Sequence, residues 1–245
     1  MSSEPTLNIY FAGDQFTHKD LMGNALLAEA ISDISDHRFC SVLPQNFPEG
    51  KKSLHRVRDD KLLTLLECDL ALFNFDGAEI EAGAVVEFMT AKFADIPTVI
   101  LRTDSRGQDE GEQHPWSLMM HFFPRTEVEV LNASAIYQNV FEEFPMSAAE
   151  DVLIEERSSE VAHTMVRVIA QAVIDAFDRV LETPSRIEPQ EAPHVYSWLA
   201  RFFGAEISSE ECNRILQRAM ARKQNRGLIP VPKSSPMRDT KPSGL

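Results

Sequence analysis

Short apolar runs alternate with longer amphipathic segments from residue 7 to residue 131, and this alternation constrains the fold more than any other feature of the sequence. Continuous apolar runs are typical of strands buried on both faces of a parallel sheet, and the segments between them have apolar residues at helical spacing. The pattern predicts an α/β fold, a doubly wound sheet of five parallel strands of the flavodoxin or Rossmann type. The expected strands are Leu7–Ala12, Phe39–Leu43, Asp69–Phe75, Thr98–Arg102 and Glu127–Leu131.

Amphipathic segments between and after the strands predict the helices. Those between strands are Lys19–Ile34, Asp59–Cys68, Ala84–Ala94 and Gln113–Phe122. Those after the last strand are Ala148–Leu181, Tyr196–Phe203 and Ser208–Met220, with Pro184, Pro189 and Pro193 indicating a linker. We therefore expect an α/β domain over residues 1–146 and a helical C-terminal extension over residues 147–222. Residues 223–245 are expected to form a disordered basic tail, because Pro, Ser, Lys and Arg dominate there.

The charge of the chain is large and unevenly distributed. There are 24 Lys and Arg against 38 Asp and Glu, a net charge of −14. Residues 213–245 contain eight basic residues and one acidic residue, a net +7, which leaves −21 (−14 minus 7) for residues 1–212. An acidic body repels phosphate backbones, so the composition argues against nucleic acid as a partner and favours a small, neutral or weakly charged ligand.

The sequence also limits the compartment and the cofactors. Cys40, Cys68 and Cys212 lie far apart and in no Cys-x-x-Cys spacing, which favours reduced thiols in a cytoplasmic protein. The N-terminus lacks the basic and long apolar regions of a secretion signal, and no window has the 18 or so apolar residues of a membrane span. We expect no metal and no dinucleotide cofactor, because no ligand cluster is present and Gly13-Asp14 lacks a Gly-x-Gly-x-x-Gly continuation.

Polar loops follow four of the expected strands. Gly13-Asp14 follows the first, Gln45 comes shortly after the second, Asp76 follows the third and Asp104 comes after the fourth. The carboxyl ends of parallel strands meet at one edge of a sheet, and ligands bind there near the point where the strand order reverses. These loops are therefore the candidates for a binding site.

Two glutamates lie at the start of the helix that follows the third strand. Glu81 is near the expected helix N-terminus, so it either complements the helix dipole or belongs to a site. Glu87 has apolar residues on both sides, so its carboxylate either points out of the core or is held in a site. Paired carboxylates at a cleft suit glycosidic-bond chemistry, in which one attacks the anomeric carbon. Tyr10 in the first strand either orients such a nucleophile or packs its ring in the core.

Taken together, these segments resemble the nucleoside 2-deoxyribosyltransferase family in order and spacing over about residues 7–131. The matching segments are Ile9–Phe16 (IYFAGDQF), Leu43–Gln45 (LPQ), Cys68–Gly77 and Glu81–Glu87 (EAGAVVE). The resemblance implies that Glu87 attacks C1′ of a 2′-deoxynucleoside, releases the base and holds the sugar as a covalent glycosyl-enzyme until a second base takes it. It implies that Tyr10 holds this glutamate and that Asp60, or its neighbour Asp59, contacts or protonates the base.

The resemblance also implies a set of substrate-binding residues. These are Gly13, Asp14, Phe16, Gln45, Asp76, Glu81, Asp104 and Ser117. Glu81 replaces the family's usual aspartate. Ser117 replaces an asparagine that reaches the sugar 5′-hydroxyl in a neighbouring subunit's site, so a homo-oligomer is implied. The first loop has Asp14 where relatives that use nucleoside monophosphates have a Ser- and Gly-rich turn, and its charge would repel a phosphate, which favours a nucleoside.

The sequence therefore predicts an enzyme that cleaves the N-glycosidic bond of a 2′-deoxynucleoside and transfers the sugar to a free nucleobase, without a cofactor. Two alternatives are open. One is a nucleoside N-glycoside hydrolase of the same fold, in which water reaches the glycosyl-enzyme first. The other is a non-catalytic nucleoside-binding sensor or scaffold. The presence of both Tyr10 and Glu87 argues against the last alternative, because a binding module does not need an oriented nucleophile.

Overall fold

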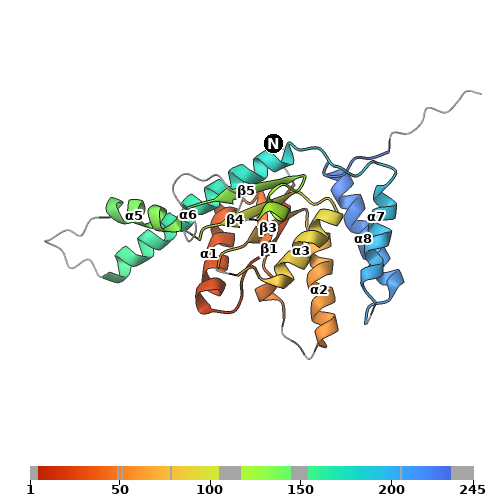
Figure 1. The fold of residues 1–245 in the computed structure, drawn as a ribbon, viewed down its shortest axis with the longest axis horizontal. Helices are drawn as coiled ribbons and strands as arrows, with labels where there is room; N and C mark the ends of the chain where they lie inside the picture. Colours follow the sequence, from red (N-terminus) through yellow and green to blue (C-terminus); the bar gives the residue numbers. More distant parts are fainter. Residues whose placement is uncertain are drawn as a thin grey trace, which may run out of the picture.

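The fold is an α/β sandwich built on one parallel sheet (Figure 1). The computed structural model describes residues 5–48, 50, 52–77, 79–104, 117–144, 154–204 and 206–232. Five strands pair in the order β2-β1-β3-β4-β5, all parallel. They are β1 (Leu7–Ala12), β2 (Phe39–Val42), β3 (Leu70–Asn74), β4 (Thr98–Arg102) and β5 (Thr126–Val130). The predicted doubly wound α/β fold is confirmed, and each strand begins and ends within one residue of its expected limits.

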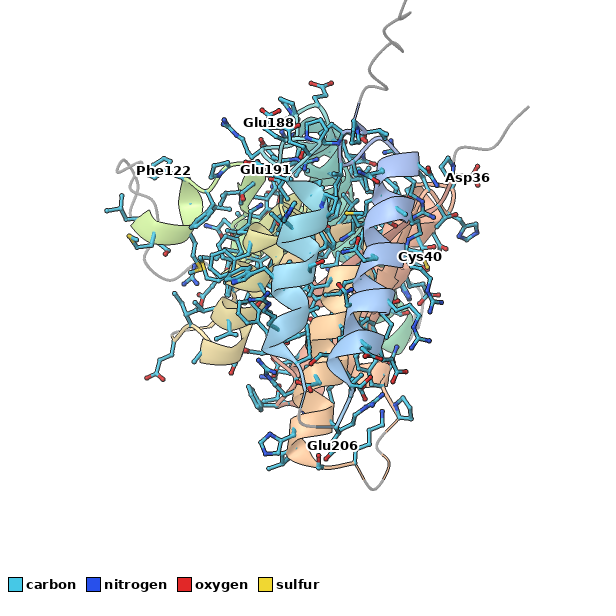
Figure 2. All side chains as sticks on the ribbon, turned by 90° about the vertical axis from the view of Figure 1, so that its right-hand side faces the viewer. Asp36, Cys40, Phe122, Glu188, Glu191 and Glu206 are labelled. Carbon is cyan, nitrogen blue, oxygen red and sulfur yellow. The ribbon has the colours of Figure 1, made fainter. Side chains whose placement is uncertain are left out.

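Helices cover both faces of the sheet. On one face lie α1 (His18–Ile34) and α6 (Ile154–Leu181), and on the other lie α2 (Leu54–Glu67) and α3 (Ala82–Phe93). The helices α7 (Ala192–Leu199) and α8 (Ser209–Asn225) lie side by side and cover the outer side of α2 (Figure 2). Shorter elements are η1 (Pro44–Asn46), α4 (Leu118–His121), α5 (Ala133–Glu143) and η2 (Ala200–Phe202).

Alternation along β1 assigns its side chains to the two faces. Ile9 and Phe11 pack in the core under α1 and α6, whereas Tyr10 and Ala12 pack in the core under α2 and α3. All four are buried. Side chains of a strand alternate between the faces of a sheet, so the position of Tyr10 in the sequence fixes the face to which its ring belongs.

Several helices differ from the sequence-based expectation. Of the expected helix Gln113–Phe122, only Leu118–His121 is helical among the described residues, and residues 113–116 lie outside them. Of Ala148–Leu181, residues 154–181 form α6 and residues 148–153 lie outside the described part. Helix α5 was not predicted; Asn132 caps it by accepting a hydrogen bond from the Ala135 N–H. Only Val140 of this helix is buried, but Ile136, Tyr137, Val140 and Phe141 lie three and four residues apart, a helical spacing that the sequence analysis missed.

Helix α6, which the sequence places in the C-terminal extension, is one of the two helices that cover the first face. Its side chains Val173, Phe177 and Val180 are fully buried against β1, β4 and α1. An extension that is separate from the α/β domain is therefore a poor description of residues 154–181, because the core of this face is incomplete without α6. Among the described residues, no helix is both long and apolar enough to cross a lipid bilayer.

The prediction of a disordered tail from residue 223 is wrong for residues 223–232. Helix α8 continues to Asn225, the side chain of Lys223 is fully buried, and Leu228 and Ile229 are core residues. Arg226 forms an ion pair with Asp69, which is itself fully buried. Lys223 and Arg226, two of the basic residues that suggested a solvated tail, have partners far away in the sequence, which composition does not reveal. Residues 233–245 lie outside the described residues.

The segment between α6 and α7 is non-helical, as its prolines predict, but it is packed against the domain. The Ser185 hydroxyl and the Arg186 N–H both donate hydrogen bonds to the Asp95 carboxylate, each at 2.7 Å. Ile187 is buried in the core beside α2, α3 and α8. Pro193 lies in the first turn of α7, where its missing N–H leaves no hydrogen bond unmade.

Candidate active site

A cavity of about 420 Å³ lies at the carboxyl end of the sheet, on the face that α2 and α3 cover. Its wall is formed by the loop after β1, one face of α2 and the first two turns of α3. The lining residues are Gly13, Gln15, Phe16, Leu54, Val57, Arg58, Lys61, Leu62, Glu81, Gly83, Ala84, Val86 and Glu87. The strand order reverses between β1 and β3, which is where open α/β sheets bind ligands. The volume is within the range of about 300–1,000 Å³ that small-molecule sites occupy.

Tyr10, which is fully buried and is not part of the lining, meets Glu87, which lines the cavity. The Tyr10 hydroxyl donates a hydrogen bond to Glu87 Oε1 at 3.0 Å, across 77 residues of sequence. Burial raises the pKa of Tyr10 well above its usual value, and the nearby Glu87 carboxylate raises it further. The tyrosine is therefore protonated at neutral pH and acts as a donor. Of the two interpretations of Tyr10 from the sequence, both hold: its ring packs in the core and its hydroxyl orients a carboxylate.

Glu87 is held inside the cavity, which answers the question that the sequence left open. Burial raises the pKa of its carboxyl group above the usual glutamate range, and the carboxylate of Glu81 adds to this. The Tyr10 hydroxyl and the Lys61 ammonium act in the opposite direction and lower the pKa of Glu87. The net result is a carboxylate that is less solvated than a surface glutamate and has a fixed direction, as a nucleophile requires.

Glu81 has two roles at once. It is the N-cap of α3, and its Oε2 accepts a hydrogen bond from the Ala84 N–H at 2.5 Å. It also lines the cavity beside Glu87. Gly83 allows this arrangement, because a Cβ at that position would lie 2.8 Å from Glu81 Oε2. The capping interpretation is therefore confirmed, and the carboxylate is at the same time available to a ligand.

Two basic residues in the cavity were missed by the sequence analysis, which expected α2 to begin only at Asp59. Val57 and Arg58 lie three and four residues after Leu54, and Lys61 lies four and three residues after them, so all four share the face of α2 that lines the cavity. The Arg58 guanidinium donates to Asp59 Oδ1 and to the Phe202 carbonyl, both at 2.7 Å. The helical spacing that starts at Leu54 was the signal that could have found them.

The acidic residues of α2 lie outside the cavity lining. The Asp60 carboxylate forms ion pairs with Lys52 and Arg56, each at 2.8 Å. Asp59 is buried and pairs with Arg58. The structure therefore does not bring the predicted base-contacting residue, Asp60, or its alternative Asp59 to the wall that Glu87 occupies. Asp59, Asp60 and Lys61 are successive residues of α2, and only Lys61 is on the face of the helix that lines the cavity.

Asp76 and Asp104 connect the loops at the ends of β3 and β4. Asp76 accepts hydrogen bonds from the Thr103 hydroxyl at 2.7 Å and from the Asp104 N–H at 3.0 Å. Asp104 accepts one from the Gly77 N–H at 3.2 Å. Neither lines the main cavity. Their carboxylates tie the loop after β3, which leads to Glu81, to the loop after β4, so they position the backbone before Glu81 and do not face the cavity.

Gln45 and Asp14 lie beside α1. The Gln45 amide nitrogen donates to the Leu21 carbonyl at 2.9 Å, and its oxygen accepts from Asn24 at 3.2 Å. Both polar atoms of the Gln45 side chain are therefore bonded to α1. Asp14 lines a second, smaller cavity of about 260 Å³ together with Asp76. Burial raises the pKa of Asp14, and neighbouring carboxylates raise it further. Gly13 and Phe16 line the main cavity as predicted, whereas Ser117 begins α4 and lies outside the lining.

The mouth of the cavity is apolar and open to solvent. Phe16 is 79% exposed and Leu54 is 86% exposed, although both belong to the lining. Large exposed apolar side chains around a polar floor are typical of a surface that receives a flat apolar ligand or another protein. In the described part of the chain, no three His, Cys, Asp or Glu side chains gather in a way that would hold a metal ion.

Comparisons with known proteins add little to this geometry. No family model matches the chain, and no curated protein matches it. Among solved structures, it is similar to a structure described as a conserved protein from Enterococcus faecalis V583, at 21% sequence identity. The match covers 71% of this chain and 99% of that chain, with a TM-score of 0.44. The function therefore has to be argued from the site itself.

Proposed function

We propose that this chain is an enzyme similar to the nucleoside 2-deoxyribosyltransferases, which cleaves the N-glycosidic bond of a 2′-deoxynucleoside and transfers the sugar to another nucleobase. The observation that carries this proposal is the hydrogen bond of 3.0 Å between Tyr10 and Glu87 in a cavity at the β1/β3 switch point. A carboxylate that is directed by a buried donor and partly removed from water suits attack on an anomeric carbon.

In the proposed reaction, Glu87 attacks C1′, the base leaves with the bonding electron pair, and the sugar is held as an ester of Glu87. A second base then attacks C1′ and frees the carboxylate. The absent 2′-hydroxyl makes the oxocarbenium-like transition state easier to reach. Glu81, which lies beside Glu87 in the lining, contacts the sugar, and Phe16 and Leu54 offer apolar surfaces for the flat base.

The partners follow from the same proposal. An uncharged nucleoside and a free nucleobase are expected ligands, and a cytoplasmic location agrees with a salvage reaction. A second copy of the chain at the open, apolar mouth of the cavity would shield the reaction from water. This homo-oligomer stays a prediction, which sedimentation of the purified protein tests.

Incubation with 2′-deoxyinosine and adenine tests the proposed activity. Chromatography is expected to detect 2′-deoxyadenosine and hypoxanthine, and mass spectrometry of the protein is expected to detect one added deoxyribosyl group. Glu87→Gln keeps a polar side chain beside Tyr10, and we expect it to reduce turnover by at least roughly a thousandfold, as loss of a nucleophile does. Free deoxyribose without exchange would indicate a hydrolase.

The non-catalytic alternative gives a different result. If no deoxynucleoside in a panel of purine and pyrimidine substrates is turned over, and Glu87→Gln binds them as well as the wild type does, the proposed enzyme activity is wrong. The chain would then be a nucleoside-binding module that has kept the cavity. A change in affinity without turnover is measured by calorimetry, which does not depend on the reaction.

A further inference from the structure

Lys61 is the basic residue of the cavity whose charge acts on the Glu87 carboxylate. It lines the same cavity as Glu87, and its ammonium is one of the two groups that lower the pKa of Glu87. None of the ion pairs found among the described residues involves Lys61. The other basic lining residue, Arg58, is already hydrogen-bonded to Asp59 and to the Phe202 carbonyl.

A departing nucleobase needs a hydrogen-bond donor, because it leaves with a pair of electrons and carries negative charge until it is protonated. The acids that the sequence suggested for this role are occupied elsewhere. Asp60 forms ion pairs with Lys52 and Arg56, and Asp59 pairs with Arg58. Neither lines the cavity, whereas Lys61, on the same helix, does.

We propose that Lys61 is the catalytic residue that protonates the departing nucleobase, in place of a carboxylic acid. The inference rests on the proposed function, because it concerns the leaving group of that reaction. It adds a residue and a role that neither the motifs nor the family resemblance assigns, since it depends on which side of α2 faces the cavity.

The steps balance in both directions. As Glu87 forms its bond to C1′, the C1′–N bond breaks and its electron pair goes to the base. The base takes a proton from the Lys61 ammonium, which becomes a neutral amine. When a second base attacks C1′, the bond between C1′ and Glu87 breaks, and the proton of the incoming base returns to the Lys61 amine. One transfer thus restores both groups without a co-reactant.

A phosphate-bearing substrate is the rival reason for a lysine in this cavity. A nucleoside 5′-phosphate would need positive charge at the end of the sugar that is remote from the base. Two observations favour the leaving group. Arg58 is already paired, so a phosphate would meet one cation, and Lys61 lines the same cavity as Glu87, whose carboxylate attacks at the bond that breaks. The experiment keeps this rival as an outcome.

Lys61→Met tests the proposal on two substrates that differ in their leaving groups. We compare 2′-deoxyinosine, whose base needs a proton, with 4-nitrophenyl 2-deoxy-β-ribofuranoside, whose phenolate leaves without one. Each protein is assayed at a pH above the acid limb of its own pH–rate profile, so that Glu87 is ionised in every sample. General acid catalysis contributes about 10²–10⁴-fold, so kcat/KM for 2′-deoxyinosine is expected to fall by about a hundredfold or more. For the nitrophenyl substrate, the expected fall is less than about threefold.

Lys52→Met is the matched control. It makes the same substitution on a lysine that pairs with Asp60 outside the cavity, so both substrates should react as they do with the wild type. A second readout is chemical rescue: Lys61→Ala should regain activity toward 2′-deoxyinosine when methylammonium is added, because a small amine can enter the space left by the side chain. Circular dichroism shows whether each variant is folded.

Three results would overturn the inference. One is an equal loss of kcat/KM on both substrates, which would mean that Lys61 only supports the structure or Glu87. The second is an unchanged rate on both. The third, measured on 2′-deoxyinosine 5′-phosphate beside the other two substrates, is an increase in KM that is confined to the phosphate, which would identify Lys61 as a phosphate ligand. A wild-type protein that cleaves neither substrate refutes the proposed function itself, which is a separate result from these three.

Discussion

The two ends of the parallel sheet both contain buried charged groups, but they differ in how those groups are paired. At the amino end, Arg125 donates to Asp95 at 2.9 Å, and both side chains are almost fully buried. Asp69, fully buried, accepts a hydrogen bond from the Asn8 N–H at 2.9 Å and pairs with Arg226. Asp95 and Asp69 are thus each paired with an opposite charge from a distant part of the chain.

At the carboxyl end, the acids lie near one another. Glu81 and Glu87 share one cavity, and Asp14 lies next to it, with burial and like charges raising the pKa of both Glu87 and Asp14. The wall there is open, with Phe16 and Leu54 exposed. Neighbouring carboxylates that lack an opposite charge are unfavourable for folding, but a ligand can bind to them. The difference agrees with a division of roles in which the amino end stabilises the fold and the carboxyl end holds the proposed active site.

The largest effect on stability is expected from Asp69→Ala at the amino end. Removal of one partner of a buried ion pair costs about 3–5 kcal/mol, and Arg226 is slightly exposed, so we expect the free energy of unfolding to fall by about 3 kcal/mol. Urea denaturation measures it. The turnover of the remaining folded protein should be unchanged. A loss of turnover at full folding would contradict the division of roles between the two ends.

Tyr10→Phe tests the carboxyl end. Without the hydroxyl, Glu87 loses the hydrogen bond that directs it and that lowers its pKa. We expect kcat/KM to fall by about 10–100-fold, since misdirection of a reacting group by a small distance has effects of this order. The acid limb of the pH profile should also move to higher pH, because the pKa of Glu87 rises when a group that lowers it is removed. An unmoved acid limb would show that Tyr10 acts only through packing.

Lys223 gives the amino end a characteristic pH dependence. The burial of its ammonium lowers its pKa to about 7, while the unfolded chain keeps the ordinary value of about 10.4. Above pH 7 the unfolded state binds more protons than the folded state, so stability rises with pH. The pKa of Cys68 is raised to about 12 by burial, which lowers stability above about pH 8.5, where the unfolded thiol ionises.

Stability of the wild type is therefore expected to increase between pH 7 and pH 8.5. Lys92, whose pKa burial also lowers to about 7, contributes in the same sense. Lys223→Met removes one of these two lysines, so the stability of this variant should rise less steeply with pH than that of the wild type. The two slopes should differ by up to about 1.4 kcal/mol per pH unit. Parallel urea titrations at several pH values measure both slopes. Equal slopes in the two proteins would mean that Lys223 is charged in the folded state.

The smallest effect is expected from Asp60→Asn. The carboxylate pairs with Lys52 and Arg56 near the surface of α2 and does not line the cavity, so its removal should change kcat/KM far less than Lys61→Met does. Partly exposed ion pairs contribute about 0–1 kcal/mol, which sets the expected change in stability. If Asp60→Asn is instead the more damaging variant, the assignment of roles along α2 is wrong.

The sequence predicted the strands well and the helices less well, for physical reasons. Leu70, Leu72 and Val99 are fully buried, and short continuous apolar runs of this kind are characteristic of strands covered on both faces. Helix α5 was missed although its apolar residues have helical spacing, and it buries only Val140. For the site, Gly13, Phe16, Glu81 and Glu87 line one cavity and Tyr10 is bonded to Glu87, and all five are residues that the family resemblance implied. The other candidates serve loops or helices instead.

By itself, the sequence determined the sheet, because continuous apolar runs are local properties; the meeting of Tyr10 with Glu87 across 77 residues was implied by the family resemblance and depends on how α3 packs on the sheet. Only the tertiary structure decided that Lys61 rather than Asp60 enters the cavity, because this depends on how α2 is rotated against the sheet. It also decided that Lys223 is buried, donating to the Leu66 carbonyl across 157 residues at 2.7 Å. Composition shows how many charges a chain has, but the packing of distant segments determines which of them are paired.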